Sequence, residues 1–216
     1  IPNCRAYDPC FAGELAVIMD HGMTRMLDEK RDEFFYITVM NENYAQPSLP
    51  KGSEADIVKG MYRLASRGDG GPRVRLLGSG TILREVIAAA EILEGYGIGS
   101  EIFSVTSFSE LARDAAEAER RTRLGAPVVA ASDYVRAVPG QIAPYLDTRM
   151  TLLGTDGFGR SANRAALRRF FEVDRQNVAL AAIDALVRKG DLDGAVLTRA
   201  IAELGVDPGA AAPWQV

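Results

Sequence analysis

The sequence is poor in the side chains that most often carry out chemistry. Its 216 residues include one histidine, two cysteines and one tryptophan. Cys4 and Cys10 do not have the spacing of a standard zinc site, and His21 is the sole histidine of the chain. No nucleophile or acid is spaced to work with His21, so we interpret it as a structural, partly exposed residue. From the residues alone we assign no catalytic residue, no cofactor-binding residue and no metal ligand.

Long apolar runs and basic clusters are also absent. No run approaches the roughly 20 apolar residues of a membrane-spanning helix. The formal net charge is −4, whereas nucleic-acid binding needs clustered lysine and arginine. We therefore expect neither a membrane nor a nucleic-acid partner. No secretory pattern supports a disulfide between Cys4 and Cys10, so we expect reduced thiols in a cytoplasmic protein.

The most informative segment is the glycine-rich loop over 153–161, which reads LGTDGFGRS. It joins an apolar run over 150–153 to a helical pattern that begins at Ser161, a residue well placed to cap a helix. The glycines permit backbone angles that other residues resist, so the chain can turn sharply here. In most proteins such a junction has only a structural role. It indicates a particular protein family only together with other motifs of the chain.

Hydrophobic periodicity predicts that helices and strands alternate along the chain. We expect strands over 34–40, 73–77, 101–105, 127–131 and 148–153. We expect helices over 8–26, 83–94, 107–124, 134–146, 161–171, 174–189 and 192–204, the first of them capped by Asp8. This order predicts an α/β fold with a mostly parallel sheet flanked by helices. The segment 41–52 has two prolines and no regular spacing of apolar residues, which indicates a linker.

The tripeptide Gly78-Ser79-Gly80 follows a predicted strand and opens a helix. Backbone donors at a helix start can hold an anion. The dinucleotide-binding fingerprint needs a third glycine three residues later, where this chain has Leu83, and no Walker lysine follows. We favour tight packing of the strand against the helix. A free-standing phosphate- or nucleotide-binding module that uses Gly78 and Gly80 is the alternative.

Four polar or amphipathic residues follow the predicted strand over 34–40: Asn41, Glu42, Asn43 and Tyr44. In open α/β sheets, ligands bind outside the carboxyl ends of the strands, so these residues are candidates for lining a site. The other interpretation is a turn in which the asparagine side chains satisfy their own backbone.

Seven segments together resemble one enzyme family. They occur in the family's order from Ile1 to Val178 and read IPNCRAYDP, FYITVMNENYAQPSLPKG, LLGSGTIL, SVTSFSELARD, ASDYVR, LGTDGFGRS and FFEVDRQNV. The chain is similar to the C-terminal part of the homodimeric pyruvate dehydrogenases, the decarboxylating first component of the pyruvate dehydrogenase complex. That family belongs to the transketolase-like superfamily.

The resemblance implies a homodimeric parent enzyme that depends on thiamine diphosphate and magnesium. Such an enzyme decarboxylates pyruvate and transfers the acetyl unit to lipoyl groups of the dihydrolipoyl acetyltransferase core. In the family, the cofactor, the metal and the catalytic residues lie upstream of the position that matches Ile1. We therefore expect no cofactor on this chain, and a role in completing the fold, supporting the dimer or docking the acetyltransferase core. By analogy with transketolases, the residues Asn41 to Tyr44 lie near the substrate entrance.

The resemblance also divides the chain into parts. Residues 1–46 correspond to the closing helix and strand of the pyrimidine-binding domain, which make a remnant of another α/β domain. Residues 47–55 correspond to a linker and 56–216 to the transketolase-like C-terminal domain. Because the sequence starts with isoleucine and runs straight into organised structure, we interpret it as a piece of a longer chain.

A lone helix and strand leave an apolar surface without a partner. We therefore expect an exposed set of Phe34, Phe35, Tyr36 and Ile37, and we expect 1–40 to be the weakest part of the chain. In the family, a longer segment with several prolines precedes the strand at 127, whereas here only Gly125 and Ala126 follow the expected helix. Either this connection is short, or residues are missing from the sequence there, and we favour the second explanation.

Overall fold

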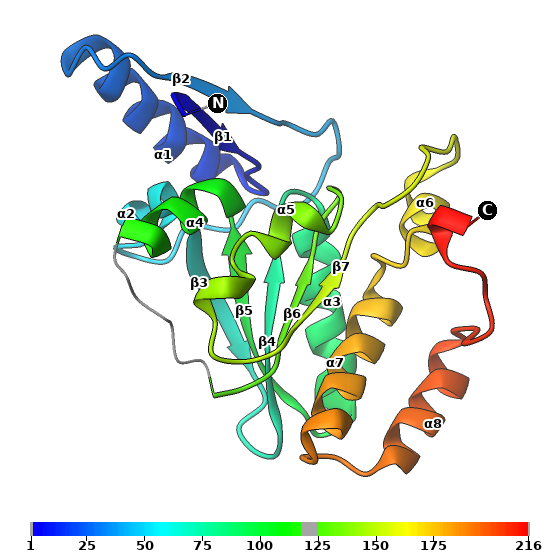
Figure 1. Ribbon diagram of the computed structural model, residues 1–216. Coiled ribbons are helices and arrows are strands. Elements are labelled where there is room, and N and C mark those ends of the chain that lie inside the picture. Colours follow the sequence, from blue (N-terminus) through cyan, green and yellow to red (C-terminus); the bar gives the residue numbers. More distant parts are fainter. Residues whose placement is uncertain (1, 118–124, 216) are drawn as a thin grey trace.

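A computed structural model describes residues 2–117 and 125–215, which form two β-sheets with helices around them (Figure 1). The small sheet consists of β1 (Cys4–Tyr7) and β2 (Phe34–Ile37), which run parallel. Between them the chain forms α1 (Ala12–Met23), which continues as the π-helical segment η1 (Thr24–Asp28). Residues 2–37 therefore make one β-α-β unit.

The large sheet has five strands in the order β3-β5-β4-β6-β7. The edge strand β3 is antiparallel to β5, and the other pairs are parallel. This arrangement confirms the predicted α/β fold with a mostly parallel sheet. The strands are β3 (Met61–Arg67), β4 (Arg73–Gly78), β5 (Gly99–Val105), β6 (Val128–Ala131) and β7 (Met150–Leu153).

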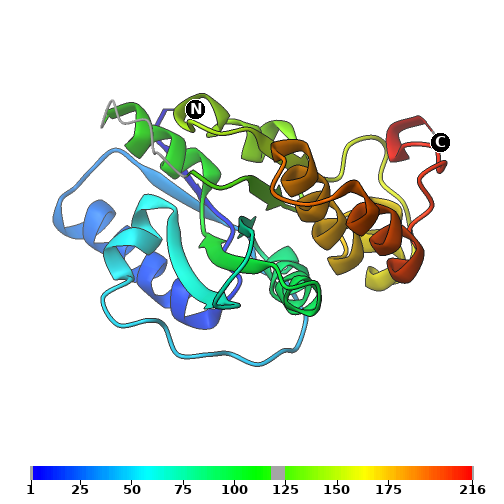
Figure 2. The same ribbon diagram turned by 90° about the horizontal axis from the view of Figure 1, so that it is seen from below.

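Helices cover both faces of the large sheet. On one face α3 and α7 bury residues such as Leu83, Val86 and Ile183 against β4 and β5, and α8 packs on α7. On the other face, Phe108 of α4 and Ile142 pack against β4 and β6. Figure 2 shows α7 and α8 (orange to red) at the opposite side of the molecule from α1 (blue). The helices of this domain are α2 (Glu54–Lys59), α3 (Ile82–Gly95), α4 (Phe108–Glu117), α5 (Ala137–Gly140), α6 (Arg164–Phe170), α7 (Arg175–Lys189) and α8 (Gly194–Leu204), with 3-10 turns η2 (Ala143–Tyr145) and η3 (Pro213–Gln215).

The first helix starts later than the sequence predicted. Asp8 does not cap it; the helix begins at Ala12, and the carboxylate of Glu14 accepts hydrogen bonds from the backbone N–H groups of Cys10 and Phe11 at 2.6 and 2.9 Å. The prediction failed because the Asp8 side chain is used elsewhere: it accepts a hydrogen bond from the Thr38 hydroxyl at 2.5 Å.

The elements β1, α2 and β3 were not predicted from the sequence. Each of them is short or lies at the edge of a sheet, so none shows the apolar run by which the central strands were found. In β3, for example, Tyr62 is buried while Arg63 is exposed, and the mixed composition hides the strand.

The expected exposed set on β2 is half correct. Phe34 and Tyr36 are 45% and 59% exposed. Phe35 and Ile37 point to the other side, because side chains alternate along a strand; the Phe35 ring stacks on Tyr7 at 5.9 Å.

Two other predicted helices also differ from the structure. The helix after the glycine loop begins at Arg164, and Asn163 rather than Ser161 caps it by accepting from the Ala166 N–H at 2.9 Å. The region over 134–146 forms the two short pieces α5 and η2. Ser107 caps α4 as expected, because its hydroxyl accepts from the Glu110 N–H at 3.0 Å. The end of that helix and the question of residues missing before Gly125 concern 118–124, which lie outside the described residues.

Candidate functional site at the carboxyl edge of the large sheet

The strand order places a crevice between the ends of β4 and β6. The chain runs from β4 to β5 on one side and then crosses to β6 on the other side of β4. Ligands of open α/β sheets bind where the strand order reverses in this way. Ser79 follows β4 and Ser132 follows β6, and the Ser79 hydroxyl donates to the Ser132 hydroxyl at 3.1 Å. Both serines are buried.

Asp8, from the end of β1, occupies the crevice. Its N–H donates to the Thr106 carbonyl at 2.7 Å, and its own carbonyl accepts from the Gly80 N–H at 3.0 Å. Burial raises the pKa of the Asp8 carboxyl, and hydrogen bonds from Thr38 and Ser79 offset part of that rise. The chain's own carboxylate thus lies where a bound anion would have to lie.

The two glycines of the Gly78-Ser79-Gly80 loop are explained by close packing. A Cβ on Gly78 would lie 2.7 Å from the Leu83 Cα, and a Cβ on Gly80 would lie 2.6 Å from the Asp8 carboxylate. Gly80 also has a φ of +49°, in the left-handed region that favours glycine. This geometry supports the packing interpretation and argues against the phosphate-binding alternative.

Glu42 lies at the centre of a cluster of arginines from α3 and α6. Its carboxylate pairs with Arg84, with Arg168 at 2.8 Å and with Arg164 at 3.7 Å. Arg168 also pairs with Glu85 of α3 at 3.2 Å. Burial acts to raise the pKa of Glu42, but the hydrogen bonds and charges of Arg168 and Arg84 outweigh it, so the pKa lies below its usual value. Glu42 therefore connects the segment after β2 to two helices of the large domain.

The neighbours of Glu42 take part in the same attachment. The Asn41 side chain accepts a hydrogen bond from Arg164. The Tyr44 hydroxyl donates to the Cys10 carbonyl, and the Arg84 guanidinium lies 4.6 Å from the centre of the Tyr44 ring. Asn43 is exposed. The structure brings Asn41, Glu42 and Tyr44 together as anchors of the chain, and their placement near a substrate entrance stays a prediction.

A buried carboxylate that was not predicted from the sequence joins the two sheets. Glu14 of α1 is fully buried. Besides the two backbone donors before α1, its carboxylate accepts from the Tyr62 hydroxyl of β3 at 2.7 Å and the Ser104 hydroxyl of β5 at 2.6 Å. The partners lie up to 90 residues away in the sequence, so no local pattern could have identified them.

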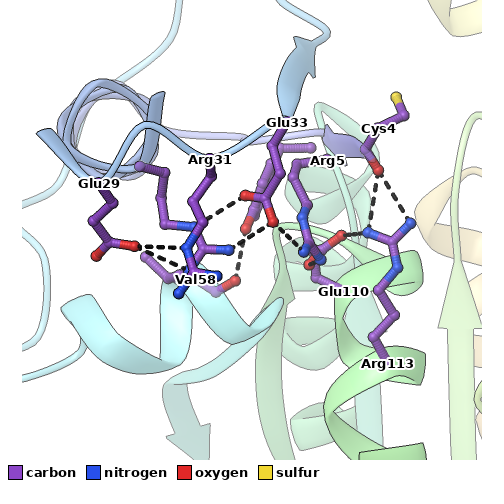
Figure 3. Close-up of polar contacts among 10 residues, drawn as sticks. Cys4, Arg5, Glu29, Arg31, Glu33, Val58, Glu110 and Arg113 are labelled. Atoms are coloured by element: carbon purple, nitrogen blue, oxygen red, sulfur yellow. Dashed lines mark hydrogen bonds and ion pairs between the residues drawn. The ribbon is translucent and has the colours of Figure 1, made fainter. Parts of the chain in front are cut away.

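A second, more exposed cluster joins β1 and β2 to α4 (Figure 3). Figure 3 shows Arg5 between Glu33 and Glu110, which it contacts at 2.6 and 2.9 Å. Arg25 also contacts Glu33 at 2.6 Å, and Arg113 pairs with Glu110 and donates to the Cys4 carbonyl. Hydrogen bonds from Arg25 and Arg5 lower the pKa of Glu33 to about 2.

The histidine and the cysteines have structural surroundings. His21 is half-buried, packs edge-on to the Phe35 ring at 6.1 Å, and has a lowered pKa because of burial and the nearby Arg25 charge. Cys4 and Cys10 are free thiols, and burial raises the pKa of Cys10 to about 12. Within the ranges 2–117 and 125–215, no three metal-ligating side chains form a group that could hold an ion, and no helix is long and apolar enough to cross a membrane.

Comparison with known proteins identifies the class of this fold. Residues 60–174 match the transketolase-like TK C-terminal domain, and residues 1–47 match the pyruvate dehydrogenase E1 component middle domain. Solved transketolases share the fold: the enzyme from Leishmania mexicana covers 89% of this chain with a TM-score of 0.66 at 18% identity, and 26% of that enzyme is matched. A split-gene transketolase, an inactive beta4 tetramer, covers 87% of this chain and is itself matched over 59%, with a TM-score of 0.57 at 16% identity.

The chain belongs to the transketolase-like C-terminal domain family. Its curated relatives include the pyruvate dehydrogenase E1 component of Pseudomonas aeruginosa, 48% identical over 96% of this chain, and that of Escherichia coli K12, 45% identical over 96%. The resemblance seen in the sequence motifs is thereby confirmed. The chain spans about a quarter (26%) of the length of these relatives.

Proposed function

We propose that this chain is the C-terminal part of a thiamine-diphosphate-dependent pyruvate dehydrogenase. The whole enzyme would decarboxylate pyruvate and transfer the acetyl unit to lipoyl groups of an acetyltransferase core in the cytoplasm. The observation that carries this proposal is the 48% identity to a pyruvate dehydrogenase E1 component along nearly the whole chain, with matches to two successive domains of that class.

We propose that this chain does not itself hold thiamine diphosphate or magnesium. Among the described residues no three metal-ligating side chains form a group that could hold an ion, and the glycine loop that could take a phosphate is closed by Asp8. We propose that other parts of the longer enzyme hold the cofactor and the metal. No step of the reaction is assigned to a residue of this chain.

The role proposed for the chain is structural. Residues 1–46 would complete the pyrimidine-binding domain, 47–55 would connect, and 56–216 would form the C-terminal domain, with Glu14 and Glu42 fixing one part to the other. The enzyme would be a homodimer that docks the acetyltransferase core. The split-gene transketolase piece, which is inactive, supports the view that a piece of this kind has no activity of its own.

The test compares the full-length enzyme, which contains this sequence, with a version that lacks it. The full-length enzyme, expressed from the complete gene, should release carbon dioxide from pyruvate when thiamine diphosphate and magnesium are added. A version truncated just before the position of Ile1 should lose that activity. Failure of the full-length enzyme to act on pyruvate, with activity on another 2-oxo acid, would contradict the proposed substrate.

A further inference from the structure

A cavity of about 240 Å³ lies beside Asp8, between the small sheet and the carboxyl ends of β4 and β5. Ser79 follows β4 and Val105 ends β5, and both residues line the cavity together with Phe108 of α4. An apolar cavity of about 150 Å³ can hold benzene. The cavity beside Asp8 therefore has room for a ring with a short side group, at the edge of the sheet where ligands of α/β proteins bind.

The walls of this cavity are aromatic and apolar. We call it the tyrosine cavity, because Tyr7, Tyr36 and Tyr134 line it, together with Phe108 and Val138. Tyr36 is 59% exposed, so the cavity opens to solvent beside β2. Aromatic rings attract organic cations through the partial negative charge on their faces. Such walls suit an apolar ligand and favour positive over negative charge.

The tyrosine cavity has a carboxylate at one end. Among the described residues that line it, Asp8 is the one charged side chain. The hydrogen-bond partners of this carboxylate are the hydroxyls of Thr38 and Ser79, which carry no charge. Within 2–117 and 125–215, no lysine, arginine or histidine forms an ion pair with it. A carboxylate can accept about four hydrogen bonds, so the two hydroxyls leave capacity for a charged donor.

The charges that act on Asp8 have the same sign as its own. Burial raises the pKa of Asp8, and the charges of Asp133 and Glu14 add to that rise. An ammonium group beside the carboxylate would oppose these effects, because it donates hydrogen bonds and supplies the opposite charge. An anion would be repelled by the same three acids.

We propose that the tyrosine cavity binds a small primary ammonium ion with an apolar body. The N–H groups of the ligand donate to the Asp8 carboxylate, and its apolar part lies against Phe108 and Val138. The proposal does not depend on the enzyme activity proposed above. It rests on the volume of the cavity, its aromatic walls and the carboxylate at its end, which no described cation neutralises.

The test titrates the 216-residue chain by calorimetry at low salt and about pH 7, where alkylamines carry a proton. The four probes are benzylamine, benzyl alcohol, methylamine and benzoate. We expect saturable binding of benzylamine. Benzyl alcohol lacks the charge and methylamine lacks the ring, so each should bind at least about tenfold more weakly, and benzoate should bind no better than either. Absence of saturable binding by benzylamine, or equally tight binding of benzyl alcohol or benzoate, would overturn the proposal.

One pair of substitutions tests the charge. Asp8→Asn keeps the shape of the side chain and should weaken benzylamine binding by about tenfold or more, while the Kd of benzyl alcohol changes less than about twofold. Asp20→Asn removes an exposed acid of α1 that does not line the cavity, and should change the benzylamine Kd less than about twofold. Equal losses in the two variants, or an equal loss of both ligands in Asp8→Asn, would refute the proposal.

A second pair tests the location. Val138→Phe places a ring inside the cavity and should abolish binding of benzylamine and benzyl alcohol alike. Val135→Phe adds the same ring at a residue that is 46% exposed and lies outside the lining, and should change neither Kd by more than about twofold. Undiminished benzylamine binding by Val138→Phe, with the wild-type Tm, would place the ligand elsewhere and overturn the proposal. Each pair is decisive without the other, so a variant that does not fold leaves a test in place.

Discussion

Two clusters of acids and their donors hold the small sheet against the large domain, and they differ mainly in burial. Glu14 is fully buried and accepts from four donors on three elements or their ends. Glu33 and its partners Arg5 and Arg25 lie nearer the surface, with side-chain exposures of 11%, 23% and 24%. A buried acceptor cannot be replaced by water when it is lost, whereas an exposed pair can be. The comparison predicts that the attachment depends far more on Glu14 than on the larger set of surface ion pairs.

The largest expected effect comes from Glu14→Gln. The amide keeps the shape of the side chain, but an NH₂ group replaces one carboxylate oxygen. This NH₂ group cannot accept hydrogen bonds, so buried N–H or O–H groups that donated to that oxygen lose their acceptor. We expect the free energy of unfolding to fall by about 3 kcal/mol or more, measured by urea denaturation.

Asp20→Asn is the matched control for this prediction. It neutralises an exposed acid on the same helix, and it should change the stability by less than about 0.5 kcal/mol. Similar losses in the two variants would mean that helix charge, and not the buried network, sets the stability of this attachment.

The next effect concerns the crevice that Asp8 fills. Gly80→Ala places a methyl group 2.6 Å from the Asp8 carboxylate at a residue with φ of +49°. We expect a loss of about 1–3 kcal/mol in unfolding free energy and no change in affinity for an anion or nucleotide.

Gly95→Ala tests the same substitution where neither constraint applies. No atom lies within 4 Å of the Cβ position, and the residue ends α3; alanine should be neutral or stabilise by up to about 1 kcal/mol. If Gly80→Ala left the Tm unchanged but abolished binding of an anion or nucleotide, the phosphate-binding interpretation would replace the packing one.

The smallest effect belongs to the surface cluster and depends on pH. The pKa of Glu33 is about 2 in the folded chain against an ordinary value of 4.5. Because the folded value is lowered, the contribution of Glu33 to stability is present above about pH 4.5 and is lost as the pH falls toward 2. Glu33→Gln should therefore cost about 1 kcal/mol at pH 7, and wild type and variant should converge near pH 2. A difference between the two that stays constant across this range would exclude the ion pairs as its cause.

The central strands and helices of the large domain were predictable, and the contacts that join the two parts were not. Buried segments such as β4 and α7 show apolar patterns of their own, so a short window of sequence suffices to find them. Asp8 and Glu14 act on partners such as Thr106 and Ser104, about 90 residues or more away. Asp8 was wrongly predicted to cap the first helix, because its side chain instead accepts a hydrogen bond from Thr38, 30 residues away. Glu42 was identified from its place after a strand, but its arginine partners became visible only in the fold.

The central claim is that this chain contributes structure and no chemistry to a pyruvate dehydrogenase. The most direct measurement is carbon dioxide release from labelled pyruvate by the purified 216-residue chain, with thiamine diphosphate and magnesium added and the full-length enzyme as the positive control. Proton transfers of this kind need positioned acids and bases, and the chain has one histidine, which packs against Phe35. We predict no release above the buffer control. Turnover by the isolated chain that rises with added thiamine diphosphate would contradict the claim.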